Sequence, residues 1–169
     1  MSDYPILPDT APGTAVEPLV TFQEEAFSDV LPELQVHWEA HRHEVGPRHI
    51  QMVLDVDIAG YRVLEAHGQL SVVTMRVDEE LVGYFISVVH PHLHYQQTLC
   101  AYNDVFYITP TYRRGWLPVQ LFRHAEMFLQ ARGAQMLFAD DKVWKDVGPI
   151  FKRCGWQPMG TLYSKWIGA

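Results

Sequence analysis

Cysteine is scarce in this sequence of 169 residues, and long hydrophobic runs are absent. The two cysteines, Cys100 and Cys154, lie far apart in apolar surroundings, which argues against a disulfide framework and is typical of a reducing compartment. No apolar stretch approaches the roughly 20 residues that a membrane-spanning helix needs, and no signal peptide is apparent. We therefore expect a cytoplasmic protein that does not enter a membrane.

Basic residues are also few. Thirteen Lys and Arg residues stand against twenty Asp and Glu residues, so the formal net charge is −7 with histidine neutral. This balance argues against a protein that coats nucleic acid with a basic face. A small basic pocket is still compatible with it, because Arg113, Arg114 and Arg123 are close in sequence, as a phosphate-bearing cofactor would require.

The chain is expected to consist of a flexible N-terminal arm, residues 1–17, and a single domain, residues 18–169. The arm contains Pro5, Pro8 and Pro12 and shows no sustained periodicity. In the domain, apolar spacings of three and four predict helices at 28–45, 58–66, 118–133 and 143–153, the last with a new start at Gly148. Runs rich in β-forming residues predict strands at 19–22, 70–77, 81–89, 100–109, 136–139 and 159–167. This order predicts an α/β fold, with a mixed sheet and helices on both of its faces.

The predicted strand 100–109 leads through a turn into the helix at 118–133. Pro110 ends the strand, Arg113 and Arg114 lie in the turn, and Pro118 suits the first helical position. The turn and the first helical residues leave backbone N–H groups unpaired, and the helix dipole adds positive potential there. The junction therefore predicts a pyrophosphate site, with an ordinary strand–turn–helix bearing surface arginines as the alternative.

The junction resembles the acyl-CoA signature of the GNAT family of N-acetyltransferases, Arg/Gln-x-x-Gly-x-Gly/Ala with its Val/Ile-x-Pro-x-Tyr-Arg lead. The residues Ile108-Thr-Pro110-Thr-Tyr112-Arg113 match the lead. The second half departs from the signature, because Trp116 and Pro118 stand where glycine or alanine is usual and Gly115 lies one place early.

Residues 61–168 are similar to the GNAT-type acetyltransferases encoded by tailed bacteriophages. The matching pieces are Gly68-Gln-Leu-Ser-Val-Val-Thr, Leu81-Val-Gly-Tyr84, His92-Leu-His94-Tyr95, the stretch from Asp104 to Arg113, Ala125-Glu126, Lys142 and Tyr163-Ser164-Lys165-Trp-Ile-Gly168. The resemblance implies a GNAT fold with about six to seven strands and acetyl-CoA (coenzyme A) as acyl donor. It also implies transfer of the acetyl group to a primary amine of a small molecule or protein, in the host cytoplasm if the chain is phage-encoded.

The same resemblance indicates where the donor would bind. The pantetheine arm is expected in a gap between residues 105–108 and the parallel strand 136–139, bonded to backbone groups. The residues expected to contact the cofactor are Phe106, Tyr107, Ile108, Arg113, Arg114, Gly115, Trp116, Leu117, Pro118 and Lys142. For Lys142, a solvent-facing side chain is the alternative.

Asp104 is the leading candidate for the general base, because a carboxylate in an otherwise apolar strand is costly without a purpose. The alternative is a structural aspartate bonded to neighbouring backbone N–H groups. Glu44 and His94 are rival bases. His92 and His94 alternate along an extended segment, but no cysteine or carboxylate at ligand spacing accompanies them, so we expect no metal.

The general acid is not evident. Many GNAT enzymes carry a tyrosine where this chain has Phe151. Tyr163 or Tyr107 would substitute for it, or the thiolate would leave unaided, since a thiol pKa near 8.5 makes it a tolerable leaving group.

Two further functions stay open. The altered signature and the missing tyrosine favour a GNAT-shaped binding protein that acts on a host partner. A metal-assisted, nucleobase-modifying relative is the third possibility, which the acidic net charge opposes. A homodimer is compatible with the sequence, and nothing in it names the acceptor amine.

Overall fold

The computed structural model describes residues 17–46 and 52–168, so the expected N-terminal arm lies almost entirely outside the described residues. The elements in chain order are β1 (Val20–Glu24), α1 (Phe27–Val45), α2 (Ile58–Ala66), β2 (Leu70–Val77), β3 (Glu80–His92), β4 (Tyr95–Ile108), the short 3₁₀ helix η1 (Pro110–Tyr112), α3 (Leu117–Ala131), β5 (Met136–Phe138) and α4 (Gly148–Cys154).

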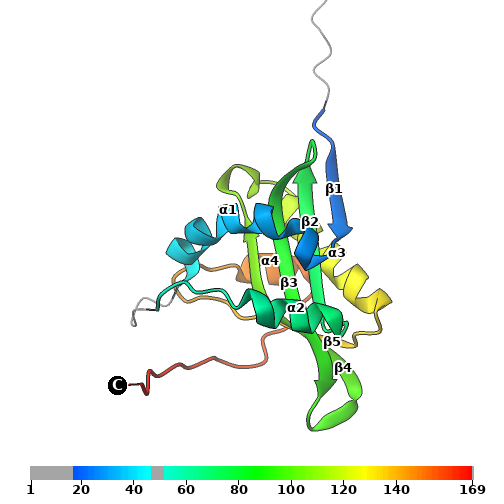
Figure 1. Cartoon of the computed structure of the whole chain (residues 1–169), viewed down its shortest axis with the longest axis vertical. Helices are drawn as coiled ribbons and strands as arrows, with labels where there is room; N and C mark the ends of the chain where they lie inside the picture. The colour runs from blue at the N-terminus through cyan, green and yellow to red at the C-terminus, as the bar shows by residue number, and fades with distance from the viewer. Residues whose placement is uncertain (1–16, 47–51, 169) are drawn as a thin grey trace, which may run out of the picture.

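The strands form one sheet in the order β1-β2-β3-β4-β5 (Figure 1). Neighbouring strands run antiparallel, except that β4 and β5 are parallel. The α/β class and the mixed sheet are thus confirmed. Within residues 17–46 and 52–168 the sheet has five strands, slightly fewer than the six to seven expected.

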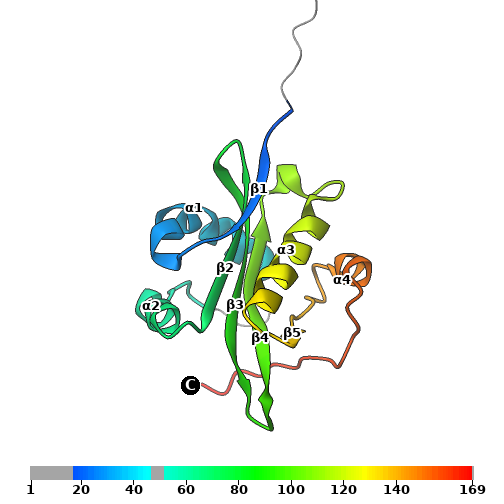
Figure 2. The ribbon, with the colours of Figure 1, turned by 90° about the vertical axis from the view of Figure 1, so that its right-hand side faces the viewer.

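Helices cover both faces of the sheet, with α1 and α2 on one side and α3 and α4 on the other (Figure 2). Each face has its own core. Phe27 and Leu34 pack with Tyr84 under α1, and Phe85 packs with Phe122 under α3. Among the described residues, no helix is both long enough and apolar enough to cross a membrane.

Glu65 of α2 holds the start of α1. Ser28 lies inside the helix, and Ala26 occupies the N-cap without a side-chain hydrogen bond. The carboxylate of Glu65 instead accepts hydrogen bonds from the backbone N–H of Phe27 and, at 2.7 Å, from the Ser28 hydroxyl. A carboxylate from another helix thus satisfies the first-turn donors that a local cap normally satisfies.

Two tight turns connect β2, β3 and β4. The β2–β3 turn consists of Asp78 and Glu79, both with positive φ, which is the geometry of a two-residue hairpin loop. The predicted strands 81–89 and 100–109 are too short at the ends that face this second turn. β3 continues to His92 and β4 begins at Tyr95, because the two strands keep pairing well beyond the apolar part of the hairpin.

The predicted strand 159–167 is not present in the structure. Residues 156–168 form no strand, and the large apolar side chains from Met159 onward are solvent-exposed, with Leu162 at 78% and Ile167 at 89%. The alternation of side chains predicted a strand, but a strand also needs an edge to pair with. β5 offers an edge of only three residues, and Pro158 and Gly160 interrupt the segment.

Candidate active site

A β-bulge interrupts β4 at Asp104. Val105 pairs with Ile86 and Asn103 pairs with Ser87, so Asp104 has no partner on β3. The Asn103 side-chain amide donates hydrogen bonds to the carbonyls of Ile86 (3.0 Å) and Val105 (3.1 Å), which stabilises the bulged backbone. Bulges bend a strand and redirect side chains, and they are over-represented next to active sites.

The pairing of β4 with β5 stops just before this bulge. The three paired positions end at Tyr102 and Phe138. From Asn103 to Ile108, the edge of β4 that faces away from β3 has no strand partner among the described residues. Pairing stops here because β5 ends at Phe138, so the expected gap between residues 105–108 and 136–139 stays a prediction. Backbone groups on this edge of β4 are not used by a neighbouring strand.

Asp104 is exposed, and its carboxylate accepts a hydrogen bond from the hydroxyl of Tyr61 on α2. Burial and then the hydrogen bond to Asp104 raise the pKa of Tyr61 above its usual value, so this phenol stays protonated and keeps donating. The hydrogen-bond partner of Asp104 therefore comes from the face of the sheet that α1 and α2 cover. Sequence analysis gave Tyr61 no role, because one tyrosine on an amphipathic helix carries no distinguishing signal.

The start of α3 has the features of an anion site. Gly115 adopts a positive φ of 68°, and α3 begins at Leu117 without a side-chain cap at Trp116. The first hydrogen bond of the helix is donated by the Gln120 N–H to the Trp116 carbonyl at 2.9 Å. The N–H groups of the preceding turn take no part in this bond. Arg114 and Gly115 are exposed at this point, and Trp116 is 63% exposed.

Arg113 points inward, unlike Arg114. Its Nε donates to the Ile108 carbonyl at 2.6 Å, and its Nη2 donates to Glu44 at 2.8 Å. The guanidinium also lies over the Tyr107 ring, 5.3 Å from its centroid. Arg113 therefore joins the end of β4 to α1, and Arg114 is the arginine left facing solvent.

Glu44 is held by cations on both sides. Arg113 lies 2.8 Å away and Lys145 lies 3.2 Å away. Burial acts to raise the pKa of Glu44, but the hydrogen bonds from Arg113 and Lys145 outweigh it and bring the pKa below its usual value. A carboxylate in this state is a weak base, so the geometry favours Asp104 over Glu44.

Two further candidates lie away from Asp104. His94 is in the turn between β3 and β4, where its N–H donates to His92 Nδ1 at 3.1 Å. Ten residues of β4 separate it from Asp104, a span of about 30 Å at the usual rise per residue. Tyr163 is 87% exposed in the irregular C-terminal segment. The structure brings neither residue together with Asp104.

The remaining expected cofactor residues surround the open edge of β4. The side chains of Phe106 and Ile108 pack toward α3, whereas Tyr107 is buried against α1. Only backbone groups on the edge of β4 that faces away from β3 are then left for a ligand, and the Ile108 carbonyl on that strand already accepts from Arg113. Leu117 and Pro118 form the first turn of α3, and Lys142 forms an ion pair with Asp140.

A pocket of about 180 Å³ lies beside Asp104 on the α1–α2 face, and both Tyr61 and Val105 line it. His41 of α1 lines it too, with only 7% of its surface exposed, and its Nδ1 lies 3.2 Å from the Tyr84 hydroxyl. Burial is the main reason that the pKa of His41 falls to about 4, so the imidazole is neutral at physiological pH.

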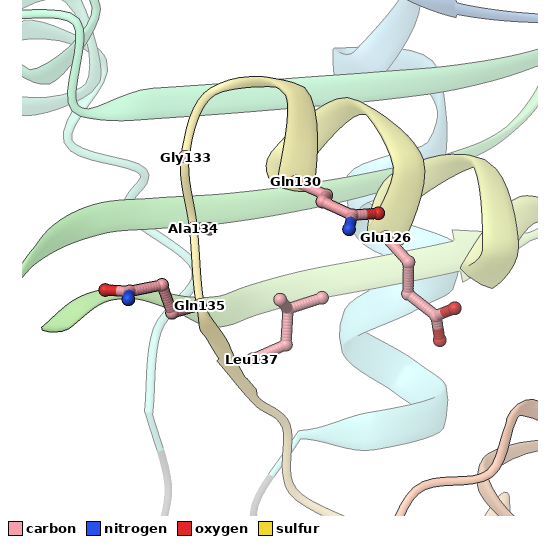
Figure 3. A pocket seen from close by; sticks show the side chains of 6 residues that line it. All are labelled: Glu126, Gln130, Gly133, Ala134, Gln135 and Leu137. Carbon is pink, nitrogen blue, oxygen red and sulfur yellow. The ribbon is translucent and has the colours of Figure 1, made fainter.

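A larger, more open hollow of about 490 Å³ lies between the C-terminal half of α3 and β5 (Figure 3). It is lined by Glu126, Gln130, Gly133, Ala134, Gln135 and Leu137, and none of the expected site residues is among them. The Glu126 carboxylate accepts a hydrogen bond from the Trp156 indole. Within the described parts of the chain, no three His, Cys, Asp or Glu side chains gather as a metal site would require.

Solved acetyltransferases share this architecture. An aminoglycoside acetyltransferase from an uncultured soil metagenomic sample, solved with trehalose, superposes with a TM-score of 0.69 at 14% identity, covering 89% of this chain and 96% of that one. A ribosomal-protein-alanine N-acetyltransferase from Brucella melitensis gives 0.69 at 15% identity, covering 89% and 99%. The fold is that of the GNAT acetyltransferases.

A predicted acetyltransferase from Clostridium acetobutylicum, solved with acetyl-CoA, also has this fold. It gives a TM-score of 0.65 at 13% identity, covering 88% of this chain and 97% of that one. No protein-family model and no curated protein matches the sequence. At these identities the likeness establishes the GNAT fold, and the activity has to be argued from the site itself.

Proposed function

We propose that this protein is an acetyl-CoA-dependent N-acetyltransferase that acts on a primary amine. The observation that carries the proposal is the unpaired edge of β4, which runs from the bulge at Asp104 to the exposed turn before α3. One continuous path thus joins a carboxylate, free strand backbone and an anion site. Solved proteins of this fold include one bound to acetyl-CoA and one bound to a bisubstrate analogue of coenzyme A, which supports the same donor here.

The donor would lie along this path. The backbone N–H groups of Gly115, Trp116, Leu117 and Val119 would hold the pyrophosphate together with the exposed Arg114, because unpaired helix N-terminal donors suit phosphate oxygens. Backbone groups of residues 104–108 would hold the pantetheine arm. The Trp116 side chain would lie over the phosphates, because it is large and stands where the usual signature has glycine.

Asp104 would serve as the base. The amine enters as an ammonium ion and must lose a proton before its nitrogen attacks the thioester carbonyl carbon. The new C–N bond then forms and the C–S bond breaks, so that sulfur leaves as a thiolate. The nitrogen loses its second proton to water, and water returns a proton to the thiolate. Tyr61 would orient the Asp104 carboxylate through its hydrogen bond, as a positioning residue.

The thiolate would leave without a tyrosine acid. Phe151 has no hydroxyl, Tyr163 lies in the exposed C-terminal segment, and Tyr107 is buried under Arg113. Burial raises the pKa of Tyr107, which makes it a poor proton donor to a thiolate. Phage origin and a cytoplasmic location stay predictions from the sequence.

Binding of acetyl-CoA to the wild type and two variants tests the donor site. Arg114→Ala should weaken binding about tenfold or more, as the loss of one charge-assisted phosphate contact implies. Arg62→Ala is the matched control, because Arg62 is an exposed arginine on α2, across the sheet. Equal acetyl-CoA affinity in Arg114→Ala and Arg62→Ala would show that Arg114 does not contact the phosphates. No binding of acetyl-CoA by the wild type would favour a GNAT-shaped binding protein.

A further inference from the structure

The pocket beside Asp104 has a mainly apolar lining. It is bounded by α1, by the segment that precedes α2 and by the sheet. Its apolar lining residues are Phe27, Trp38, Val45, Leu54, Val56, Ile86 and Val105, and its other lining residues are His41, Arg42, Gly46 and Tyr61. No carboxylate occurs among these described lining residues. Met52 and Val53 add exposed apolar side chains next to Leu54.

The charges around the pocket do not favour a ligand that carries more than one ammonium group. Arg42 lines the pocket, and its Nη2 donates to Glu39 at 2.7 Å. Glu44 is already paired with Arg113 and Lys145. A ligand with several ammonium groups would therefore meet a guanidinium at the pocket and carboxylates that are already neutralised.

One carboxylate is placed for one ammonium group. Asp104 directly precedes the lining residue Val105, and it accepts a hydrogen bond from the lining residue Tyr61. An amine that reaches Asp104 therefore projects the rest of its structure into the apolar part of the pocket.

The volume of the pocket limits what this part of the ligand can be. About 180 Å³ is comparable to apolar cavities of about 150 Å³ that take up benzene. We propose that the acceptor is a monoamine whose amino group is joined by a short link to one aryl or branched alkyl group of about that size. This inference rests on the proposed acetyl transfer and adds the class of its acceptor.

Acetylation of a graded set of amines tests the proposal. Purified protein is given acetyl-CoA with phenethylamine, ethylamine, spermidine or glucosamine, and thiol release is followed over a range of amine concentrations. Phenethylamine should exceed ethylamine in kcat/KM by about 10- to 100-fold, the usual return for burying one phenyl group. Spermidine and glucosamine should both fall below phenethylamine.

A pair of variants with the same substitution locates the effect. Val45→Phe fills the pocket, so it should lower the ratio of kcat/KM for phenethylamine to that for ethylamine at least about tenfold. Val63→Phe places the same ring on the exposed surface of α2 and should keep the wild-type preference. Melting temperatures of both variants, and calorimetric binding of phenethylamine to the protein–coenzyme A complex, accompany the rates.

The outcomes separate the acceptor class from the reaction itself. If acetyl-CoA is consumed but spermidine or glucosamine is preferred, or if Val45→Phe and Val63→Phe behave alike while both are folded, the acceptor class is overturned and acetyl transfer stands. If acetyl-CoA neither binds nor is consumed with any amine, the proposed function fails. If turnover is absent but acetyl-CoA binds, calorimetry decides, and no binding of phenethylamine overturns the acceptor class.

Discussion

The pH dependence of stability should carry the signature of buried His41. Burial is the largest influence on its pKa, and the charges of Arg113 and Lys142 lower it further, whereas Glu44 and Asp104 act in the opposite direction. The result is a pKa of about 4 in the folded protein, against an ordinary value of 6.5. The unfolded chain therefore binds a proton in a pH range where the folded chain does not.

The sign follows from this difference. The stability linked to neutral His41 is fully present above about pH 6.5, and it is lost as the pH falls toward 4. The two pKa values predict a loss of about 2 kcal/mol between pH 8 and pH 5, and about 3 kcal/mol once the pH is below 4. Below that range, this histidine adds no further pH dependence.

Urea unfolding of the wild type and of His41→Gln, at a series of pH values, measures the effect. Glutamine does not titrate, and its amide can still hydrogen-bond the buried Tyr84 hydroxyl. The free-energy difference between wild type and variant should therefore shrink by about 2 kcal/mol from pH 8 to pH 5. His43→Gln alters an exposed histidine of the same helix and should follow the wild type. Parallel curves for His41→Gln and wild type would refute the reasoning.

Three other substitutions test the site. Asp104→Asn should lower turnover about 10²- to 10⁴-fold and leave coenzyme A affinity nearly unchanged, whereas a fall in melting temperature with normal turnover would make Asp104 a structural residue. Tyr61→Phe should lower kcat about tenfold and change the pH–rate profile of the base, because one hydrogen bond to a partly exposed carboxylate is lost, and an unchanged profile would remove its positioning role. Arg113→Ala should lower the melting temperature, since Glu44 and the Ile108 carbonyl lose a cationic partner. A loss of coenzyme A affinity with unchanged stability would instead show that Arg113 binds the phosphates.

Much of the fold was predictable because its local signals agree with its packing. The helix Ile58–Ala66 and the strand Leu70–Val77 have the bounds that apolar spacing predicted. Gly133 and Gly155 have positive φ values at the ends of α3 and α4, as expected of glycines at helix ends. The predicted strand 159–167 was wrong because alternating side chains indicate which side chains would share one face of a strand. They do not indicate which sheet edge that strand could pair with.

The site was predictable only in part. The strand, turn and helix around Asp104 and Arg114 follow from sequence patterns, because each is a local feature. The hydrogen bond from Tyr61 and the ion pair of Arg113 with Glu44 span 43 and 69 residues, and nothing local marks them. The sequence likewise could not distinguish Arg113 from Arg114, since the direction of each side chain depends on where α1 lies.

Calorimetric titration of the wild-type protein with acetyl-CoA tests the central claim most directly. We expect saturable binding at one site per chain, with displacement by coenzyme A and weaker binding in Arg114→Ala than in Arg62→Ala. An absence of binding heat, together with a melting temperature that acetyl-CoA does not raise, would contradict it.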